Sequence, residues 1–156
     1  MPRLAALPQI QRNMLLTRAV EINDGAPRAG LARPLPEATV AIVTSAGIHS
    51  RGDRPFGRDD PSLRVIPSGA GAGDLLQSHS SLAFDKTAFI RDVNVVFPID
   101  RLAELTAEKR IGRVGPRHYS VMGALQDVSV MADETAPALA RRLVEDGVDV
   151  VLLTPT

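Results

Sequence analysis

The chain has 156 residues, 44% of them hydrophobic and 23% charged, which is the composition of one ordinary globular domain. Its 18 basic and 18 acidic residues cancel, and it has four Phe, one Tyr and no Trp, so it lacks both the basic field and the aromatic platform of a nucleic-acid-binding protein. The absence of cysteine excludes disulfides, thiolate metal sites and a thiol nucleophile within these residues.

The sequence contains no run of about 18 apolar residues, so we expect no membrane span. Pro8 and several polar residues interrupt the N-terminal segment, whereas a signal peptide has an unbroken apolar core. We therefore expect a cytoplasmic protein that binds neither membrane nor nucleic acid.

Residues 1–38 are predicted to be a helical and extended N-terminal segment. Ile10, Met14 and Leu15 supply an apolar side for a helix after Pro8, and three prolines between residues 27 and 36 favour an extended connector. An α/β domain is expected over residues 39–156.

Four apolar runs are predicted as strands. Residues 39–44 have the continuous β-branched character of a strand covered on both faces. The other three runs are residues 63–66, which stop at Pro67, residues 93–97 and residues 148–153. Because these runs alternate with helical patterns, we expect an α/β fold with a layered, open and mostly parallel sheet and helices on its faces.

Two amphipathic helices are predicted in the second half of the chain. One begins near Pro98 and ends near Gly112. The other begins at residue 136 after Thr135, which is the expected cap, carries one apolar stripe that we expect to pack in the core, and ends at Gly147 in the left-handed conformation.

The glycine-rich run at residues 69–73 is predicted to be a mobile loop rather than a phosphate cradle. No Lys follows it, and Asp74 would repel phosphate. Asp74 is instead expected to cap a short helix at residues 75–77.

Six segments in one order carry a resemblance to a known family. The segments are residues 43–49 (VTSAGIH), 52–56 (GDRPF), 64–67 (RVIP), 78–85 (SHSSLAFD), 92–102 (DVNVVFPIDRL) and 117–123 (RHYSVMG). In this order they resemble the selenoprotein B component of glycine, sarcosine, betaine and D-proline reductases, especially its short relatives. The resemblance covers residue 38 to the C-terminus.

The resemblance implies an oxidoreductase that cleaves a C–N bond of a small amine or amino acid-like substrate. In the family, the stretch that resembles residues 145–156 is followed by selenocysteine or, in some relatives, cysteine. We therefore expect the nucleophile just after Thr156, and hypothesise that the chain is terminated at a UGA codon and is inactive by itself. In the reaction that the resemblance implies, a selenolate at the end of a parallel strand attacks carbon, and a dithiol system reduces the adduct.

Candidate substrate-binding residues follow from the same segments. His49 and His79 are expected to protonate a leaving amine or to orient substrate, with Asp85 orienting His79. The alternative is loop histidines bonded to backbone carbonyls. The wide spacing of His49, His79 and His118 matches no local ligand motif, so we expect neither a metal nor a cofactor on this chain. A hydrolase triad of Ser78, His79 and Asp85 is rejected, because no Gly-x-Ser-x-Gly elbow is present.

Charged residues alternate in the loop after the first predicted strand. Arg51 is the candidate that binds a substrate carboxylate through a two-pronged hydrogen bond. The alternative is a solvated loop whose arginines and aspartates pair with one another.

Two other functions stay open. A non-catalytic assembly module would pair with a second chain through its last strand, so we expect a homo- or hetero-oligomer. A histidine-metal hydrolase would require stoichiometric metal.

Overall fold

The computed structural model describes residues 4–17, 29–81 and 86–155. They belong to two units, Met1–Gly30 and Leu31–Thr156. In the first unit a 3₁₀ turn, η1 (Leu4–Ala6), precedes helix α1 (Gln9–Thr17), so a helix does follow Pro8. The first element of the second unit is the 3₁₀ turn η2 (Leu35–Glu37), and all strands of the described residues belong to this unit.

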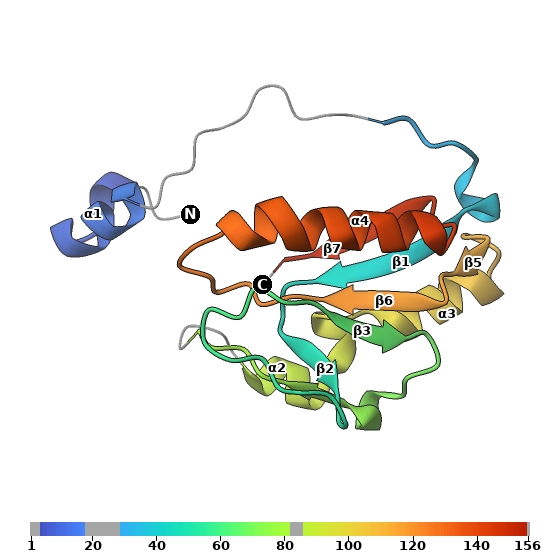
Figure 1. The fold of residues 1–156 in the computed structure, drawn as a ribbon, viewed down its shortest axis with the longest axis horizontal. Coiled ribbons are helices and arrows are strands. Elements are labelled where there is room, and N and C mark those ends of the chain that lie inside the picture. The colour runs from blue at the N-terminus through green and yellow to red at the C-terminus, as the bar shows by residue number, and fades with distance from the viewer. Residues whose placement is uncertain (1–3, 18–28, 82–85, 156) are drawn as a thin grey trace. The chain divides into compact units, whose positions relative to one another are not determined.

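Strand β1 (Thr39–Thr44) is the centre of a five-stranded sheet (Figure 1). It pairs in parallel with β7 (Val150–Thr154) along one edge. Along its other edge it pairs in parallel with β5 (Arg113–Val114) and then with β6 (Arg117–Ser120). All six residues of β1 are buried, as the unbroken apolar pattern predicted.

Two of the strand pairs are antiparallel. β3 (Arg64–Pro67) lies beside β6 at one edge of the main sheet. β2 (Ile48–Ser50) and β4 (Leu75–Gln77) form a separate two-stranded ribbon. The predicted α/β fold with a mostly parallel sheet is confirmed, with β3 as its antiparallel edge strand.

The two faces of the sheet are covered unequally. Helix α4 (Ala136–Glu145) lies over one face, and α3 (Ile99–Ala107) and α2 (Lys86–Arg91) lie on the other (Figure 1). The hydrophobic core is on the α3 side, where Ile42, Phe97 and Leu102 are buried together. No residue of α4 is fully buried, and Val144 is 78% exposed, so the predicted core role of its apolar stripe is wrong for that residue.

Two predicted elements differ in the structure. Residues 93–97 are a 3₁₀ turn, η4 (Val93–Val95), because the Asp92 side chain accepts a hydrogen bond from the Asn94 N–H and closes the turn. Residues 75–77 are strand β4 rather than a helix, and Asp74 ends the preceding 3₁₀ turn η3 (Ala72–Asp74).

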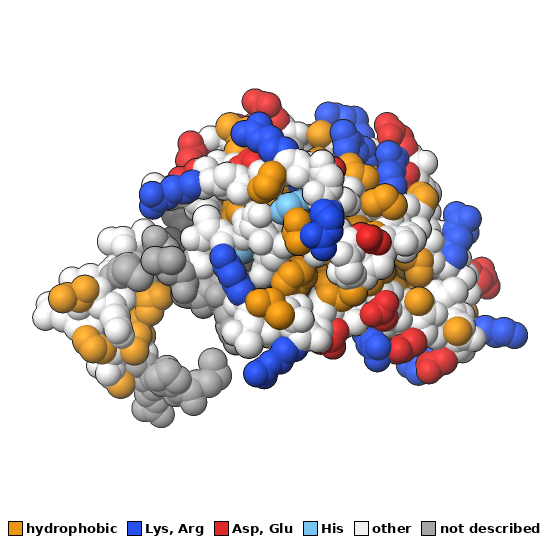
Figure 2. Space-filling view, turned by 90° about the horizontal axis from the view of Figure 1, so that it is seen from below, with side chains coloured by type: hydrophobic (Ala, Val, Ile, Leu, Met, Phe, Trp, Pro, Cys, Tyr) orange, Lys and Arg blue, Asp and Glu red, His pale blue; other side chains and the backbone are white. Residues whose placement is uncertain are grey.

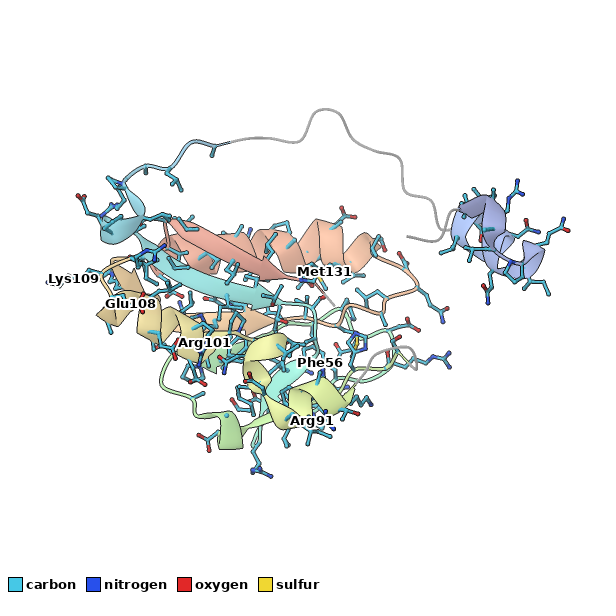
Figure 3. The ribbon with its side chains drawn as sticks, turned by 180° about the vertical axis from the view of Figure 1, so that it is seen from behind. Phe56, Arg91, Arg101, Glu108, Lys109 and Met131 are labelled. Carbon is cyan, nitrogen blue, oxygen red and sulfur yellow. The ribbon has the colours of Figure 1, made fainter. Side chains whose placement is uncertain are left out.

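Both predicted helices end or begin in a different way. Helix α3 ends at Ala107 rather than near Gly112, and Lys109 takes a left-handed φ of 57° in the following turn (Figure 3). Thr135 does not cap α4, because it lies inside a longer helical run that includes a π-helical turn, η5 (Met131–Thr135), and its hydroxyl donates to the Pro61 carbonyl. Gly147 closes α4 with a φ of 64°, as predicted.

The last strand is more exposed than its sequence predicts. Leu152 is 38% exposed and Leu153 is 67% exposed, and among the described strands β7 pairs only with β1. It is therefore an edge strand rather than a strand covered on both sides. None of the helices in the described part of the chain is long and apolar enough to cross a membrane.

Candidate active site at the carboxyl edge of the sheet

The carboxyl ends of β1 and β7 are joined by hydroxyl groups. Thr44 Oγ1 and Thr154 Oγ1 both donate to the carbonyl oxygen of Val96, at 2.9 and 2.8 Å. The Ser45 N–H donates to the Thr154 carbonyl at 3.2 Å. Ligands of open α/β sheets bind outside the carboxyl ends of the strands, so this edge is the candidate site.

A shallow hollow of about 230 Å³ opens at this edge. Ser45, Val121, Leu153 and Pro155 are among the residues that line it. Its wall is mostly apolar, and β1 and β7 both contribute to it. A group attached just beyond β7 would therefore start beside this hollow.

Two glycines allow the segments at this edge to approach closely. Gly47 has a φ of 65°, and its N–H donates to the Val121 carbonyl at 3.1 Å. A side chain at Gly123 would place a Cβ only 2.9 Å from the Ser45 carbonyl oxygen, which accepts a hydrogen bond from the Gly123 N–H. The segments after β1 and after β6 are therefore held against each other by backbone contacts.

His49 lies on β2 and is buried, with 1% of its surface exposed. Its Nδ1 is 2.9 Å from the Ser50 carbonyl oxygen, and its Nε2 is 2.9 Å from Ser78 Oγ. Because a carbonyl only accepts, Nδ1 carries the proton in the neutral ring and Nε2 accepts from the Ser78 hydroxyl. The ring of Phe56 lies edge-on to the imidazole, with 6.4 Å between the two ring centroids.

His79 is also buried and follows Ser78 directly. Its Nδ1 accepts the Ser81 N–H at 3.2 Å. Burial, with a smaller contribution from the Lys86 charge, lowers the pKa of His79 below its ordinary value, so the ring is neutral at neutral pH. Figure 2 shows that only small patches of imidazole reach the face seen from below.

Neither His49 nor His79 is among the residues that line the hollow between β1 and β7, and Arg51 is not among them either. Arg51 lines a separate hollow of about 310 Å³ whose lining includes Arg91, Asp92 and Asp100 but neither histidine (Arg91 is labelled in Figure 3). The Arg51 guanidinium donates to the Gly73 carbonyl at 3.0 Å. Asp85 lies outside the described residues.

The charged loop is organised by Arg64, a residue of β3. Its guanidinium lies 4.2 Å from the centre of the Phe56 ring and 3.2 Å from the Asp60 carboxylate. Burial alone would raise the pKa of Asp60, but hydrogen bonds from Ser62 and Gly57 and the Arg64 charge lower it to about 2. An aspartate of the loop, Asp60, therefore pairs with an arginine of strand β3, Arg64, and the sequence pattern did not indicate this contact.

His118 has a structural role that the sequence analysis missed. Its Nδ1 accepts the Ile42 N–H at 3.0 Å, where β5 and β6 are interrupted by Gly115 and Pro116. The imidazole thus replaces a carbonyl of the neighbouring strand. Burial lowers its pKa to about 4. The Gly-Pro pair just upstream was the available signal for a break in the strand.

Ser78 was also missed as a partner of His49. The two residues are 29 positions apart, and only the pairing of β2 with β4 brings them together. No local motif connects them in the sequence.

The family model for glycine/sarcosine/betaine reductase selenoprotein B matches residues 73–156, and the chain belongs to this family. The D-proline reductase subunit gamma of Acetoanaerobium sticklandii is 40% identical over 123 residues, which cover 78% of this chain and 50% of that protein. The glycine reductase complex component B subunit gamma of Carboxydothermus hydrogenoformans is 33% identical and covers 85% of this chain.

A third relative, the sarcosine reductase complex component B subunit beta of Peptoclostridium acidaminophilum, is 28% identical over 85% of this chain. The chain spans about half the length of the D-proline reductase subunit and 31% of each of the other two relatives. No solved structure matches it. The family resemblance seen in the sequence is thus confirmed.

Proposed function

We propose that this chain is part of a selenoprotein B-type reductase subunit and builds one wall of the site where a C–N bond is reductively cleaved. The observation that supports this most strongly is the family match, which spans β4 to the end of β7. The hollow between the ends of β1 and β7 supports the same placement. The substrate is a small amine or amino acid.

The nucleophile is proposed to be a selenocysteine or cysteine just beyond Thr156, at the carboxyl end of β7. Its anion forms a bond to the substrate carbon, and the electron pair of the C–N bond leaves with the nitrogen. A dithiol then supplies two electrons to release the product and becomes a disulfide. A selenolate is ionised near neutral pH, which suits a site with an apolar wall.

In this proposal His49 and His79 supply the polar groups of the site. Both are buried. His49 lies two residues after Gly47, and His79 follows Ser78, whose N–H donates to the Gly47 carbonyl. Arg51 and Asp85 stay sequence-based predictions.

The test is reconstitution of the full-length natural gene product with its partner subunits. Glycine, sarcosine and D-proline, which the names of the relatives indicate, are assayed with a dithiol as reductant. We expect cleavage of one of them, abolished when the residue after Thr156 is changed to alanine. Iodoacetamide at mildly acidic pH should alkylate that residue in the unaltered protein. A codon for neither selenocysteine nor cysteine at that position would contradict the assignment of the nucleophile.

A second candidate function is an assembly module that pairs through β7. The observation that favours it is the edge position of β7, with Leu152 and Leu153 exposed. Analytical ultracentrifugation of the 156-residue chain tests it. We expect an oligomer that a Leu152→Lys/Leu153→Lys double variant dissociates, with an unchanged circular dichroism spectrum. A monomeric parent chain would contradict this function.

A further inference from the structure

We propose that Thr44 is a positioning residue of the reductase. Its buried hydroxyl fixes the end of β7 and, through that strand, the place of the nucleophile that follows it. The proposal rests on the proposed function, which puts a selenocysteine or cysteine just beyond Thr156. It assigns a task to a threonine that no catalytic motif marks, and four features of the structure support it.

The first feature is a polar side chain that is buried at the end of the central strand. Thr44 is the last residue of β1, and none of its surface is exposed. The preceding residues of the strand, from Val40 to Val43, are all apolar. A hydroxyl in such surroundings costs free energy unless it is hydrogen-bonded, and valine has nearly the same shape without that cost. The hydroxyl is thus explained by its hydrogen bonds rather than by packing.

The second feature is the set of hydrogen bonds that this hydroxyl makes. Thr44 Oγ1 donates to the Val96 carbonyl at 2.9 Å and lies 3.3 Å from the Thr154 carbonyl oxygen. The same oxygen accepts the Ala46 N–H at 3.2 Å. One side chain therefore contacts the residue after turn η4, the end of β7 and the segment that follows β1.

The third feature is a second hydroxyl on the same carbonyl. Thr154, which is the register partner of Thr44, donates through Oγ1 to the Val96 carbonyl at 2.8 Å (β7 and β1 are neighbours in Figure 1). A carbonyl oxygen has two lone pairs and can accept both bonds. Among the described strands β7 pairs only with β1, so its outer edge gives no support. The two threonines therefore hold the end of a strand that is free on one side.

The fourth feature is the short stretch of chain between this anchor and the proposed nucleophile. The nucleophile would be the third residue after Thr154, and an extended chain advances about 3.3–3.6 Å per residue. Thr44 and Thr154 also line the hollow of about 230 Å³ at the carboxyl edge of the sheet. A displacement at the anchor would thus reach the nucleophile, and the hollow beside it, through only a few residues.

The expected consequence is a change in alignment. A nucleophile and a substrate carbon react efficiently only at near-attack distance, and a displacement of about 1 Å can cost about 10²-fold in rate. Iodoacetamide is a small reagent that diffuses to the nucleophile and does not depend on the alignment of a bound substrate. Loss of the anchor should therefore slow turnover and leave the alkylation rate unchanged.

The experiment uses the full-length reductase assembled with its partner subunits. Thr44→Val keeps the shape of the side chain and removes the hydroxyl. It should lower kcat by about 10–10²-fold, with KM within about twofold of the parent and the alkylation rate unchanged. Thr44→Ser keeps the hydroxyl and should recover most of kcat.

Thr39→Val is the matched control. Thr39 is also buried and lies at the opposite end of the same strand, where its hydroxyl accepts a hydrogen bond from Arg113 Nε at 2.8 Å. This variant also loses one side-chain hydrogen bond of β1, but far from the carboxyl edge. It should keep the kcat of the parent.

Thr154→Val is the second variant, used if Thr44→Val does not fold. It removes one of the two donors from the Val96 carbonyl, which keeps Thr44. It should lower kcat by roughly 3–10-fold, the range that one neutral hydrogen bond supplies, again with an unchanged alkylation rate. Melting curves of all the variants show whether each is folded.

The outcomes are distinct. Folded Thr44→Val and Thr154→Val proteins with the kcat of the parent would overturn the positioning role alone. An equal loss of kcat in Thr39→Val, or a parallel fall in the alkylation rate, would also overturn it, because a general structural change would then explain the effect. A parent assembly that cleaves none of the three substrates would contradict the proposed function and the positioning role together.

Discussion

His49 and His118 are both completely enclosed, yet their ring nitrogens have different hydrogen-bond partners. His118 lies within the main sheet, binds the β1 backbone through Nδ1, and packs its ring perpendicular to Phe97 at 5.6 Å. His49 lies on the small β2–β4 ribbon and ends at a half-buried hydroxyl. Burial alone therefore does not distinguish the two histidines, and the partner of the second ring nitrogen does.

The two histidines differ most clearly at Nε2. In the described part of the chain its Nε2 has no hydrogen-bond partner. Any added proton at Nδ1 would remove the acceptor of the Ile42 N–H inside the core. His118 thus supports the sheet only while it is neutral, whereas both ring nitrogens of His49 have hydrogen-bond partners.

The largest expected effect is on folding. His118→Leu leaves the buried Ile42 N–H without an acceptor and disturbs the packing against Phe97, so we expect a loss of about 3 kcal/mol in the free energy of unfolding. His118→Asn, whose amide oxygen replaces Nδ1 as acceptor, should lose less. Urea denaturation measures both. Equal losses would mean that the hydrogen bond contributes nothing.

The next effect concerns pH. His118 has a pKa of about 4 when folded and 6.5 as its reference value, so the unfolded chain binds the proton more readily between these values. Stability is full above pH 6.5 and falls by on the order of 3 kcal/mol as the pH drops to 4. His79, whose pKa is also lowered, adds to this slope. Denaturation series at several pH values should show a smaller slope for His118→Asn; an unchanged slope would refute the assignment.

A smaller effect is expected beside His49. Gly47→Ala puts a side chain into a left-handed conformation and brings its Cβ to 3.2 Å from the Ser78 carbonyl oxygen. We expect a loss of about 1–2 kcal/mol in stability, because the side chain is strained in this conformation and crowds the Ser78 backbone. Gly52→Ala is the control, since a Cβ there meets no atom within 4 Å. Urea denaturation measures both, and equal stabilities of the two variants would contradict the prediction.

The smallest effect is expected at Arg51. Its side chain is exposed and lines the hollow that contains neither histidine. Arg51→Ala should therefore change the free energy of unfolding by less than about 0.5 kcal/mol and KM by less than about twofold. Substrate titrations of the reconstituted reductase measure this. A tenfold rise in KM would instead support the carboxylate-binding role predicted from the sequence.

Elements with strong local signals were predictable from the sequence. The β1 run is continuously apolar and is buried throughout. The amphipathic pattern of α4 predicted the helix and its closing glycine, although no residue of the helix is fully buried. Residues 93–97 have the same β-branched composition but form a turn, because a single bond from Asn94 to Asp92 outweighs the strand preference. Whether a short apolar run without a flanking turn or cap signal forms a strand or a turn therefore depends on such contacts.

The sequence by itself determined the family and the α/β class, because those features depend on local order and composition. Only the tertiary structure decided which groups meet. It placed Ser78 on His49, moved Arg51 to another hollow and gave His118 to the sheet. The physical reason is that a hydrogen bond forms only between groups that the fold brings to within about 3 Å of each other. Ser78 and His49 are 29 positions apart, and His118 and Ile42 are 76 positions apart, so no local sequence pattern indicates either contact.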